Sequence, residues 1–305
     1  MPNTQYPTKP IQILVPGVKG GPSDDIARLL AEKLPLSLGQ KVSVETLVPL
    51  NDCYELAAKA PADGHTLLMG GATFFINAAL YRNLPFDSRT AFAPVSLAAS
   101  IVNVLVVNPS IPARSFDEFL AHLKANPGVL KYGSSSFASP PHLAGELFRQ
   151  MAGVDIVHVP FEGHLAAGHA LVEGRDIQFM FDAILSAKSH IDAGEVIPLA
   201  VTSLKRAPVI GEIPTLSECG LTGYDINPDM GVLVPAATPQ DVVTTLSSAI
   251  RKIMHSSEVR TRLENVGMEA LGTTPEGYRG HMRSSFTKWA TVMKNAGIEP
   301  RDLTA

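Results

Sequence analysis

The chain has 305 residues, of which 45% are hydrophobic and 18% charged, and its formal net charge is −4. This composition is typical of a folded protein with ample apolar material for its cores, and it excludes a disordered chain. No basic run or basic face stands out, so we expect no nucleic-acid partner. The length suggests two domains of about 150 residues each.

The N-terminal stretch MPNTQYPTKP lacks the basic start and apolar middle of a signal peptide. No apolar run approaches the ~20 residues needed to cross a bilayer. Two explanations stay open: a cytoplasmic protein, or a mature exported chain whose signal has been removed. The two cysteines, Cys53 and Cys219, show no metal-type or redox-type spacing, and we expect two separate thiols, with pairing left open.

Strand-like runs alternate with helical patterns in the first part of the chain. Strands are predicted over residues 11–16, 41–48 and 65–71. Helices are predicted over about 23–34, 54–60 and 72–80. Ser23 occupies the position of a helix N-cap, with Asp24 and Asp25 in the first turn. This order of elements predicts a parallel sheet with helices on its faces.

The apolar run over residues 93–110 is longer than one ordinary strand, and we interpret it as a strand that leaves one domain and enters the next. The alternation then restarts. Strands are predicted over 130–136, 155–161, 176–182 and 196–203, and helices over 116–124, 142–151, 165–173 and 184–193. A Pro- and Gly-rich stretch with a strand at 231–236 precedes a mostly helical C-terminal region.

The chain is therefore expected to cross between two α/β units twice, at about 100–108 and at about 223–233. We predict a discontinuous domain 1, residues 1–103 and 227–305, and an inserted domain 2, residues 104–226. Two linkers that span a cleft allow hinge closure around a small ligand.

The glycine turn after the first predicted strand is a candidate anion site. Gly17, Gly20 and Gly21 allow a ligand to approach the backbone closely. The amides that begin the next helix, from Ser23 onward, lack intrahelical partners and can bind an anion. A plain tight turn is the alternative. The stretch lacks the Gly-Lys-Ser/Thr ending of a phosphate-binding loop and the glycine pattern of a dinucleotide site.

A serine-rich loop follows a later strand and opens a helix in the same way. Ser134, Ser135, Ser136 and Ser139 supply hydroxyl and backbone donors. The G-x-S-x-G pattern of a nucleophile elbow is absent, so a loop that holds a polar ligand is favoured. The enzyme alternative is a hydrolase that uses one of these serines with His142 as its base.

Two further strand-to-helix turns, at 158–168 and 179–187, have a similar polar character. In the second turn, Asp182 is either an acceptor that points into the cleft or the N-cap of the next helix. The histidines at positions 158, 164 and 169 do not have the i, i+4 spacing of a helical zinc site, and no metal is expected.

These turns should share one edge of the sheets, because the carboxyl ends of parallel strands and the starts of the following helices lie together. No paired acid and base stand out, which favours binding over catalysis. The candidate ligand contacts are Gly17, Val18, Lys19, Gly20, Gly21, Ser23, Ala72, Thr73, Phe74, Ser134, Ser135, Ser136, Ser139, His142, Phe161, Glu162, Phe181, Asp182 and Asp229.

An ordered series of motifs resembles the Bug-type periplasmic solute receptors of tripartite tricarboxylate transporters (TctC-like proteins). The series includes YPTKPIQILVP with GGPSD, APADGHTLLMG, YGSSSFASPPHLAGELF, HVPFEG, MFDAILSA and VPAATP, and it runs nearly end to end. The resemblance implies a type II periplasmic binding protein fold, an α/β fold of two domains with a ligand cleft and two crossover linkers. It also implies no catalysis and no cofactor.

The resemblance further implies a periplasmic location, with the export signal absent from this sequence, and a monomeric receptor. The ligand would be a small mono- or dicarboxylate, and the partners would be the membrane components of a tripartite tricarboxylate transporter. A module that reports its ligand to a sensor is a further alternative. In the family, the first turn and the serine loop pinch a carboxylate, which here implies residues 17–23 and 134–139; Asp182 matches the family's cleft Asp.

The chain departs from the family pattern at the wall of this site. Gly17-Val18-Lys19 stands where the family usually has Phe-Ala-Pro, and Pro22 stands where it has a third glycine. Ser136 replaces a glycine of the serine loop, and TLVPLNDC replaces a longer Gly-rich loop after the second strand. The ligand's identity therefore stays open. Lys19 either adds a charge for a second carboxylate or is solvated, which we favour.

Overall fold

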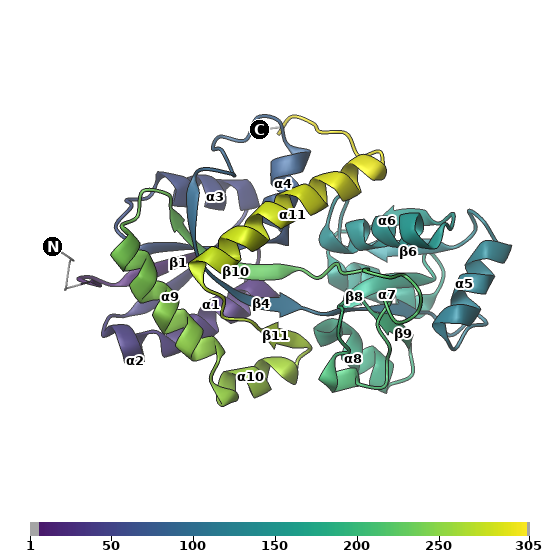
Figure 1. Ribbon diagram of the computed structural model, residues 1–305. Coiled ribbons are helices and arrows are strands. Elements are labelled where there is room, and N and C mark those ends of the chain that lie inside the picture. Colours follow the sequence, from purple (N-terminus) through teal and green to yellow (C-terminus); the bar gives the residue numbers. More distant parts are fainter. Residues whose placement is uncertain (1–5, 304–305) are drawn as a thin grey trace.

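The computed structural model describes residues 6–303, which form two mixed sheets flanked by helices (Figure 1). The six-stranded sheet has the order β11-β4-β10-β3-β1-β2. Its strands are β1 (Ile11–Pro16), β2 (Val42–Leu47), β3 (Thr66–Gly71), β4 (Phe92–Ile101), β10 (Asp229–Pro235) and β11 (Met268–Ala270). The five-stranded sheet has the order β7-β6-β8-β5-β9. Its strands are β5 (Asn103–Val107), β6 (Lys131–Ser134), β7 (Val157–Pro160), β8 (Phe179–Ala183) and β9 (Ile197–Val201).

We call each sheet with its helices a lobe: the first lobe holds the six-stranded sheet and the second lobe the five-stranded sheet. The helices of the first lobe are α1 (Pro22–Lys33), α2 (Pro35–Leu38), α3 (Leu50–Lys59), α4 (Ala72–Leu80), α9 (Gln240–Met254), α10 (Ser257–Glu264) and α11 (Pro275–Asn295). Those of the second lobe are α5 (Phe116–Ala125), α6 (Pro140–Ala152), α7 (His164–Glu173), α8 (Ile184–Asp192) and the 3-10 turn η1 (Pro208–Ile210).

The prediction of parallel strands is correct for part of each sheet. Strands β1, β2 and β3 pair in parallel, and so do β6, β7 and β8. Strand β10 runs antiparallel to β3 and β4, and β5 runs antiparallel to β8 and β9. The antiparallel strands β4, β5 and β10 are those next to the connections between lobes. The short strand β11 was missed, because the region around it was interpreted as helical.

The predicted strand that passes from one unit to the next is confirmed. Strand β4 ends at Ile101 in the first sheet, and β5 begins at Asn103 in the second sheet. The second connection runs from β9 to β10. The two connections are tied together, because the Thr202 hydroxyl accepts from the Asn103 amide (3.2 Å) and donates to the Asn227 side chain (2.7 Å). The exact domain limits stay a prediction.

Period-two alternation explains how β1 joins two cores. Ile13 and Val15 pack with the apolar face of α1, including Ile26 and Leu30, whereas Leu14 belongs to the core on the opposite face of the sheet. All of these side chains are fully buried, and each contributes roughly 1.5–3 kcal/mol through burial of apolar surface. The first strand and its helix therefore hold the intervening turn in a fixed position.

Helix α1 begins earlier than predicted. Its N-cap residue is Gly21, and Pro22 is the first helical residue, so the assignment of Ser23 as N-cap is wrong. Proline suits the first helical position, because its missing N–H would have had no partner there and its φ is already helical. Ser23 therefore lies in the first turn, with its amide at the open end of the helix.

Helix α11 connects the two lobes. It packs against α4 and β4 of the first lobe and against α6 of the second (Figure 1). The chain then turns back toward the first lobe, where Arg301 forms a parallel bridge with Tyr81. Within residues 6–303, every helix is too short or too polar to pass through a bilayer.

Candidate ligand-binding site

A cavity of about 120 Å³ lies where the first turns of α1, α4 and α6 converge. Its lining residues are Pro16, Pro22, Ser23, Leu50, Tyr54, Met69, Gly71, Ala72, Thr73, Ile101, Pro140, Pro228, Asp229 and Met230. Pro140 comes from the serine-loop side of the second lobe, whereas Pro22 and Ser23 come from the first lobe. The starts of α1 and α6 therefore border one cavity. Of the two segments predicted to grip the ligand, 17–23 contributes Pro22 and Ser23 to the lining, and 134–139 contributes none of its residues.

A larger groove of about 550 Å³ lies on the other side of the connections between the lobes. Side chains alternate along extended chain. Ile101 and Pro228 face the cavity, whereas Val102 and Asn227 face the groove. The smaller cavity is the candidate ligand site, because the helix N-termini, which attract anions, converge there.

The glycines of the first turn shape it and do not supply free donors. The amide of Gly17 donates to the Leu47 carbonyl (2.9 Å), and that of Gly21 donates to the Val18 carbonyl (3.2 Å). Gly20 has φ of 76°, in the left-handed region that favours glycine. The Gly20 amide donates to the Asp24 carboxylate (2.9 Å), so the expectation that these glycine amides bind the ligand is wrong for all three glycines.

The amides of Ser23 and Asp24 are the free donors of this turn. Neither has an acceptor within residues 6–303. Both belong to the first turn of a 12-residue helix, whose dipole adds to their attraction for an anion. Val18 and Lys19 are exposed and lie outside the cavity lining, which agrees with the favoured interpretation of Lys19 as a solvated side chain.

The buried carboxylate of Asp24 fixes the geometry of the turn. It accepts from the Gly20 amide (2.9 Å), the Thr46 hydroxyl (2.6 Å) and the Arg28 guanidinium (2.7 Å). Burial opposes ionisation, but these hydrogen bonds and the Arg28 charge lower the pKa of Asp24 to about 2. Asp24 thus joins β2, the glycine turn and α1 through one ionised group.

The start of α4 forms a second group of donors. Gly71 is the N-cap, and the amides of Ala72 and Thr73 have no acceptor in the described chain. A Cβ on Gly71 would lie 2.6 Å from the Asp229 carbonyl oxygen, so only glycine fits there without displacement. The close approach of β3 and β10 therefore places the α4 N-terminus at the cavity.

The serine loop turns its hydroxyl groups inward. The hydroxyls of Ser134 and Ser139 both donate to the Ser136 carbonyl, at 2.8 and 2.7 Å. Ser134 is fully buried, and its oxygen also lies 2.7 Å from His158 Nε2. The loop thus supports the start of α6 from behind. Helix α6 begins at Pro140, two residues before the predicted start at residue 142.

His142 and His158 form a neutral stacked pair behind this loop. Their ring centroids are 3.7 Å apart, with an interplanar angle of 14°. His142 Nδ1 accepts from the Ala138 amide (2.9 Å), and burial lowers the pKa of each imidazole to about 4. Ser134 is thus buried, and Nδ1 of His142 is occupied by a backbone amide. Ser135 and Ser136 are less buried, and within residues 6–303 neither forms a hydrogen bond with His142.

The turn before α7 braces the serine loop. The Phe161 amide donates to the Ser134 carbonyl, and the Gly163 amide donates to the Ser135 carbonyl, both at 2.9 Å. Phe161 and Glu162 lie outside the cavity lining. The same holds for Ser135 and Ser136, which support the loop in this structure.

Two predicted ligand contacts lie in the apolar cores. Phe74 is 1% exposed and packs among the rings of Tyr54, Phe75 and Phe286. Phe181 is fully buried against Phe148 and Tyr224. Their assignment to the site was wrong, because a position at a strand or helix end does not tell which face the side chain takes.

Asp182 matches neither sequence-based interpretation. Its Oδ1 accepts from the Ala183 amide (2.8 Å) and the Ser186 hydroxyl (2.7 Å), while Ala183 is the N-cap residue of α8. Burial raises the pKa of Asp182, with the Ser186 hydrogen bond opposing the shift. The carboxylate is outside the cavity lining and serves the first turn of α8.

Asp229 lines both the cavity and the groove, and its carboxylate pairs at 2.8 Å with His281 of α11, which lines the groove. Several residues in the cavity wall, among them Leu50, Tyr54 and Met230, were not predicted from the sequence. Leu50 lies in the shortened connection after β2, where the sequence departs from the family pattern. That departure was the one feature of the sequence that pointed to Leu50 as part of the site.

The described part of the chain holds no group of His, Cys, Asp and Glu residues that could bind a metal. Cys53 is buried and Cys219 is half-buried, and both are free thiols. The expectation of two separate thiols is therefore confirmed.

Comparison with known sequences supplies relatives along nearly the whole chain. A family model described as "Tripartite tricarboxylate transporter family receptor" matches residues 26–298. A protein encoded in the tcbD–tcbE intergenic region of a Pseudomonas species is 35% identical over 291 residues, 94% of this chain and 86% of the relative. Protein BugT of Bordetella pertussis is 30% identical and covers 96% of this chain and 91% of its own.

Solved structures match the fold closely. Rpa4515 of R. palustris with adipate superposes with a TM-score of 0.84 at 33% identity, covering 97% of this chain and 100% of its own. MatC of Rhodopseudomonas palustris with bound malate gives a TM-score of 0.78 at 28% identity, covering 94% and 99%. The periplasmic binding protein BugD gives 0.81 at 28% identity, covering 97% and 100%.

These matches have the fold of periplasmic binding proteins, and the family consists of solute receptors and not of enzymes. The hydrolase alternative is therefore wrong, because the family consists of receptors. The chain belongs to the tripartite tricarboxylate transporter receptor family, whose members include Bug-type solute-binding proteins.

Proposed function

We propose that this protein captures a small carboxylate in the cavity between its lobes and delivers it to the membrane components of a tripartite tricarboxylate transporter. We place this activity in the periplasm, as for the BugD neighbour. The receptor would act as a monomer with a hinge between its two domains. Domain 1 comprises residues 1–103 and 227–305, and domain 2 comprises residues 104–226.

One observation carries the proposal: free amides at the starts of α1 and α4 converge on one shared cavity. The amides of Ser23, Asp24, Ala72 and Thr73 have no acceptor in the described chain. Unpaired N–H groups at helix N-termini bind anions through hydrogen bonds and the helix dipole together. Two such helix starts in one cavity favour a carboxylate, whose two oxygens can be shared between them.

The cavity lining contains no Lys or Arg within residues 6–303, and its one charged member is Asp229. Affinity for an anion must therefore come from backbone amides. The remaining walls are mostly apolar, among them Leu50, Tyr54 and Met230, and suit a short hydrocarbon segment. The similar proteins solved with adipate and with malate hold ligands of this chemistry.

The first experiment is isothermal titration calorimetry with adipate, malate and succinate, and with adipamide as the uncharged control. A bound carboxylate should also raise stability by about 2.7 kcal/mol at a hundredfold excess over its Kd. Adipamide should give no heat, because it lacks the anion that the amides recognise. Absence of binding across a wider panel of mono- and dicarboxylates would refute the proposal.

A proline substitution isolates a single donor. Ser23→Pro removes one free amide at the second helical position, where a proline is tolerated, and α6 already begins with two prolines, Pro140 and Pro141. Loss of one charge-assisted hydrogen bond should weaken carboxylate binding roughly ten- to hundredfold. Ser23→Ala, the matched control, keeps the amide and should change the affinity far less.

The transporter partner requires its own test. Membranes that contain the transporter components should retain more of the purified receptor when the bound carboxylate is present than when it is absent. Equal retention in both conditions would contradict delivery to that partner while leaving carboxylate capture intact.

A further inference from the structure

The C-terminal segment after α11 is attached to the first lobe by its backbone. The Arg301 amide donates to the Leu80 carbonyl (2.8 Å), and the Arg82 amide donates to the Arg301 carbonyl (3.1 Å). The Leu303 amide donates to Asn83 Oδ1 (2.6 Å). Figure 1 shows this segment returning from the far end of α11 toward α4. Residue 301 is thus held in a fixed place at the end of α4.

From that place, the Arg301 side chain reaches both lobes. Its guanidinium carbon lies 5.6 Å from the ring centroid of Tyr81 in the first lobe and 5.5 Å from that of Phe137 in the second. Both distances are within the range of an attractive cation–π contact. Within residues 6–303, Arg301 forms no ion pair with a carboxylate. Its guanidinium contacts the two rings and donates a long hydrogen bond to the Tyr81 hydroxyl (3.5 Å).

Phe137 belongs to the serine loop and is 46% exposed, which is unusual for so large an apolar ring. The next residue, Ala138, has φ of 57°, a left-handed conformation that is costly for alanine. The Ala138 amide is the donor to His142 Nδ1. A force on the Phe137 ring is therefore transmitted to the backbone that leads into α6 and the cavity.

We propose that Arg301 is a positioning residue that holds the serine loop of the second lobe against the first lobe and slows separation of the lobes. Movement of the lobes apart would withdraw Phe137 from Arg301, while the backbone contacts of Arg301 and its contact with Tyr81 would persist. The inference rests on the proposed function, since a slower opening would retain a bound carboxylate for longer.

The test measures the distance between lobes without any ligand. Spin labels on cysteines placed at the exposed Ser37 in α2 and Ala121 in α5 report on opposite ends of the molecule (Figure 1). Cys219 is replaced by Ser, and Cys53 is left in place, because burial raises its thiol pKa to about 12 and it does not react. Double electron–electron resonance then gives the ratio of closed to open molecules.

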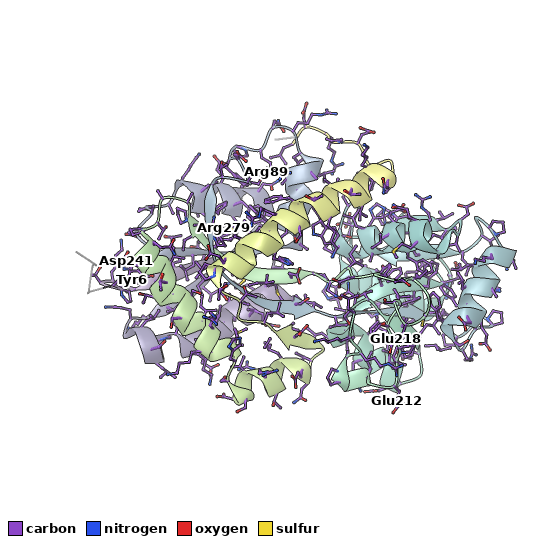
Figure 2. All side chains as sticks on the ribbon, viewed as in Figure 1. Tyr6, Arg89, Glu212, Glu218, Asp241 and Arg279 are labelled. Carbon is purple, nitrogen blue, oxygen red and sulfur yellow. The ribbon has the colours of Figure 1, made fainter. Side chains whose placement is uncertain are left out.

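Arg301→Met should lower the closed-to-open ratio about two- to fivefold, the factor expected for one exposed cation–π contact. Arg301→Lys should keep most of the wild-type ratio, because it preserves the charge. The matched control is Arg279→Met near the start of α11 (Figure 2), an exposed arginine far from the rings, which should leave the ratio unchanged.

A double-mutant cycle separates this role from a merely structural one. Phe137→Leu should lower the ratio as Arg301→Met does, and the double variant should show no further loss. The same variants should raise the dissociation rate of a bound carboxylate and leave its association rate nearly unchanged. A ratio in Arg301→Met equal to that of Arg279→Met would overturn the proposal. Because the spin-label measurement needs no ligand, failure of carboxylate binding would not be confused with failure of this inference.

Discussion

Replacement of Asp24 by Asn tests whether one ionised group organises the first turn of the site. The lowered pKa of Asp24, about 2 against an ordinary value near 3.9, corresponds to about 2.5 kcal/mol of stability at neutral pH. Because its partner Arg28 is half-exposed, part of this energy is screened. We expect Asp24→Asn to lower the free energy of unfolding by about 2 kcal/mol at pH 7.

The pH dependence gives the sign of the effect. A carboxyl group whose pKa is lowered by folding stabilises the protein above its unfolded pKa, and this stability is lost as pH falls through the folded value. About half of the difference between wild type and Asp24→Asn should remain at pH 3, and little should remain at pH 2. Carboxylate affinity should also fall, because the Ser23 amide and its neighbour are no longer held in register.

Urea unfolding followed by the fluorescence of Trp289, the single tryptophan and 2% exposed, provides the assay. The matched control is Asp25→Asn. Asp25 is exposed, and partial desolvation by the surrounding protein, together with the neighbouring Asp24 charge, raises its pKa. Its neutralisation should therefore cost nothing or stabilise slightly. Equal losses for the two variants, or a loss for Asp24→Asn that does not shrink toward pH 2, would refute the reasoning.

Three further predictions concern other parts of the fold. Stability should fall between pH 6.5 and pH 4 by up to ~3 kcal/mol for each of His142 and His158, because the unfolded chain binds protons that these two buried imidazoles resist, and His142→Phe should remove about half of that fall in a pH series of urea curves. Gly71→Ala should destabilise the protein and weaken ligand binding, whereas Gly168→Ala, an open position in α7, should stabilise it by up to ~1 kcal/mol by thermal denaturation. A thiol reagent should modify Cys219 in the native protein but Cys53 only after unfolding, as counted by mass spectrometry.

The sequence specified much of the fold because its elements have clear signals. Apolar runs bounded by glycine and proline located most strands within a few residues, and the long run 93–110 correctly marked the passage between sheets. The direction of the crossing strands was not predictable from local pattern. Whether β5 runs parallel or antiparallel to β8 depends on how the lobes are connected in space.

The sequence predicted which segments lie near the site better than it predicted which backbone amides are free to bind a ligand. The positions of the glycine turn and of the α6 start followed from the order of strands and helices. The donors did not, because hydrogen bonding inside the turn decides which amides stay free. The amides of Gly17 and Gly21 donate to carbonyl groups of the fold, whereas the Ser23 amide has no acceptor within residues 6–303. Phe181 was misassigned since one residue along a strand reverses the side that a side chain faces.

The two connections between the lobes form a wall that is one chain thick. Ile101 and Pro228 line the cavity on one side of it, and Val102 and Asn227 line the broad groove on the other. If the lobes rotate about this wall so that the cavity becomes smaller, the groove on the opposite side must become larger. A fluorescent probe attached at the rim of the groove would thus record capture of a solute that it never touches.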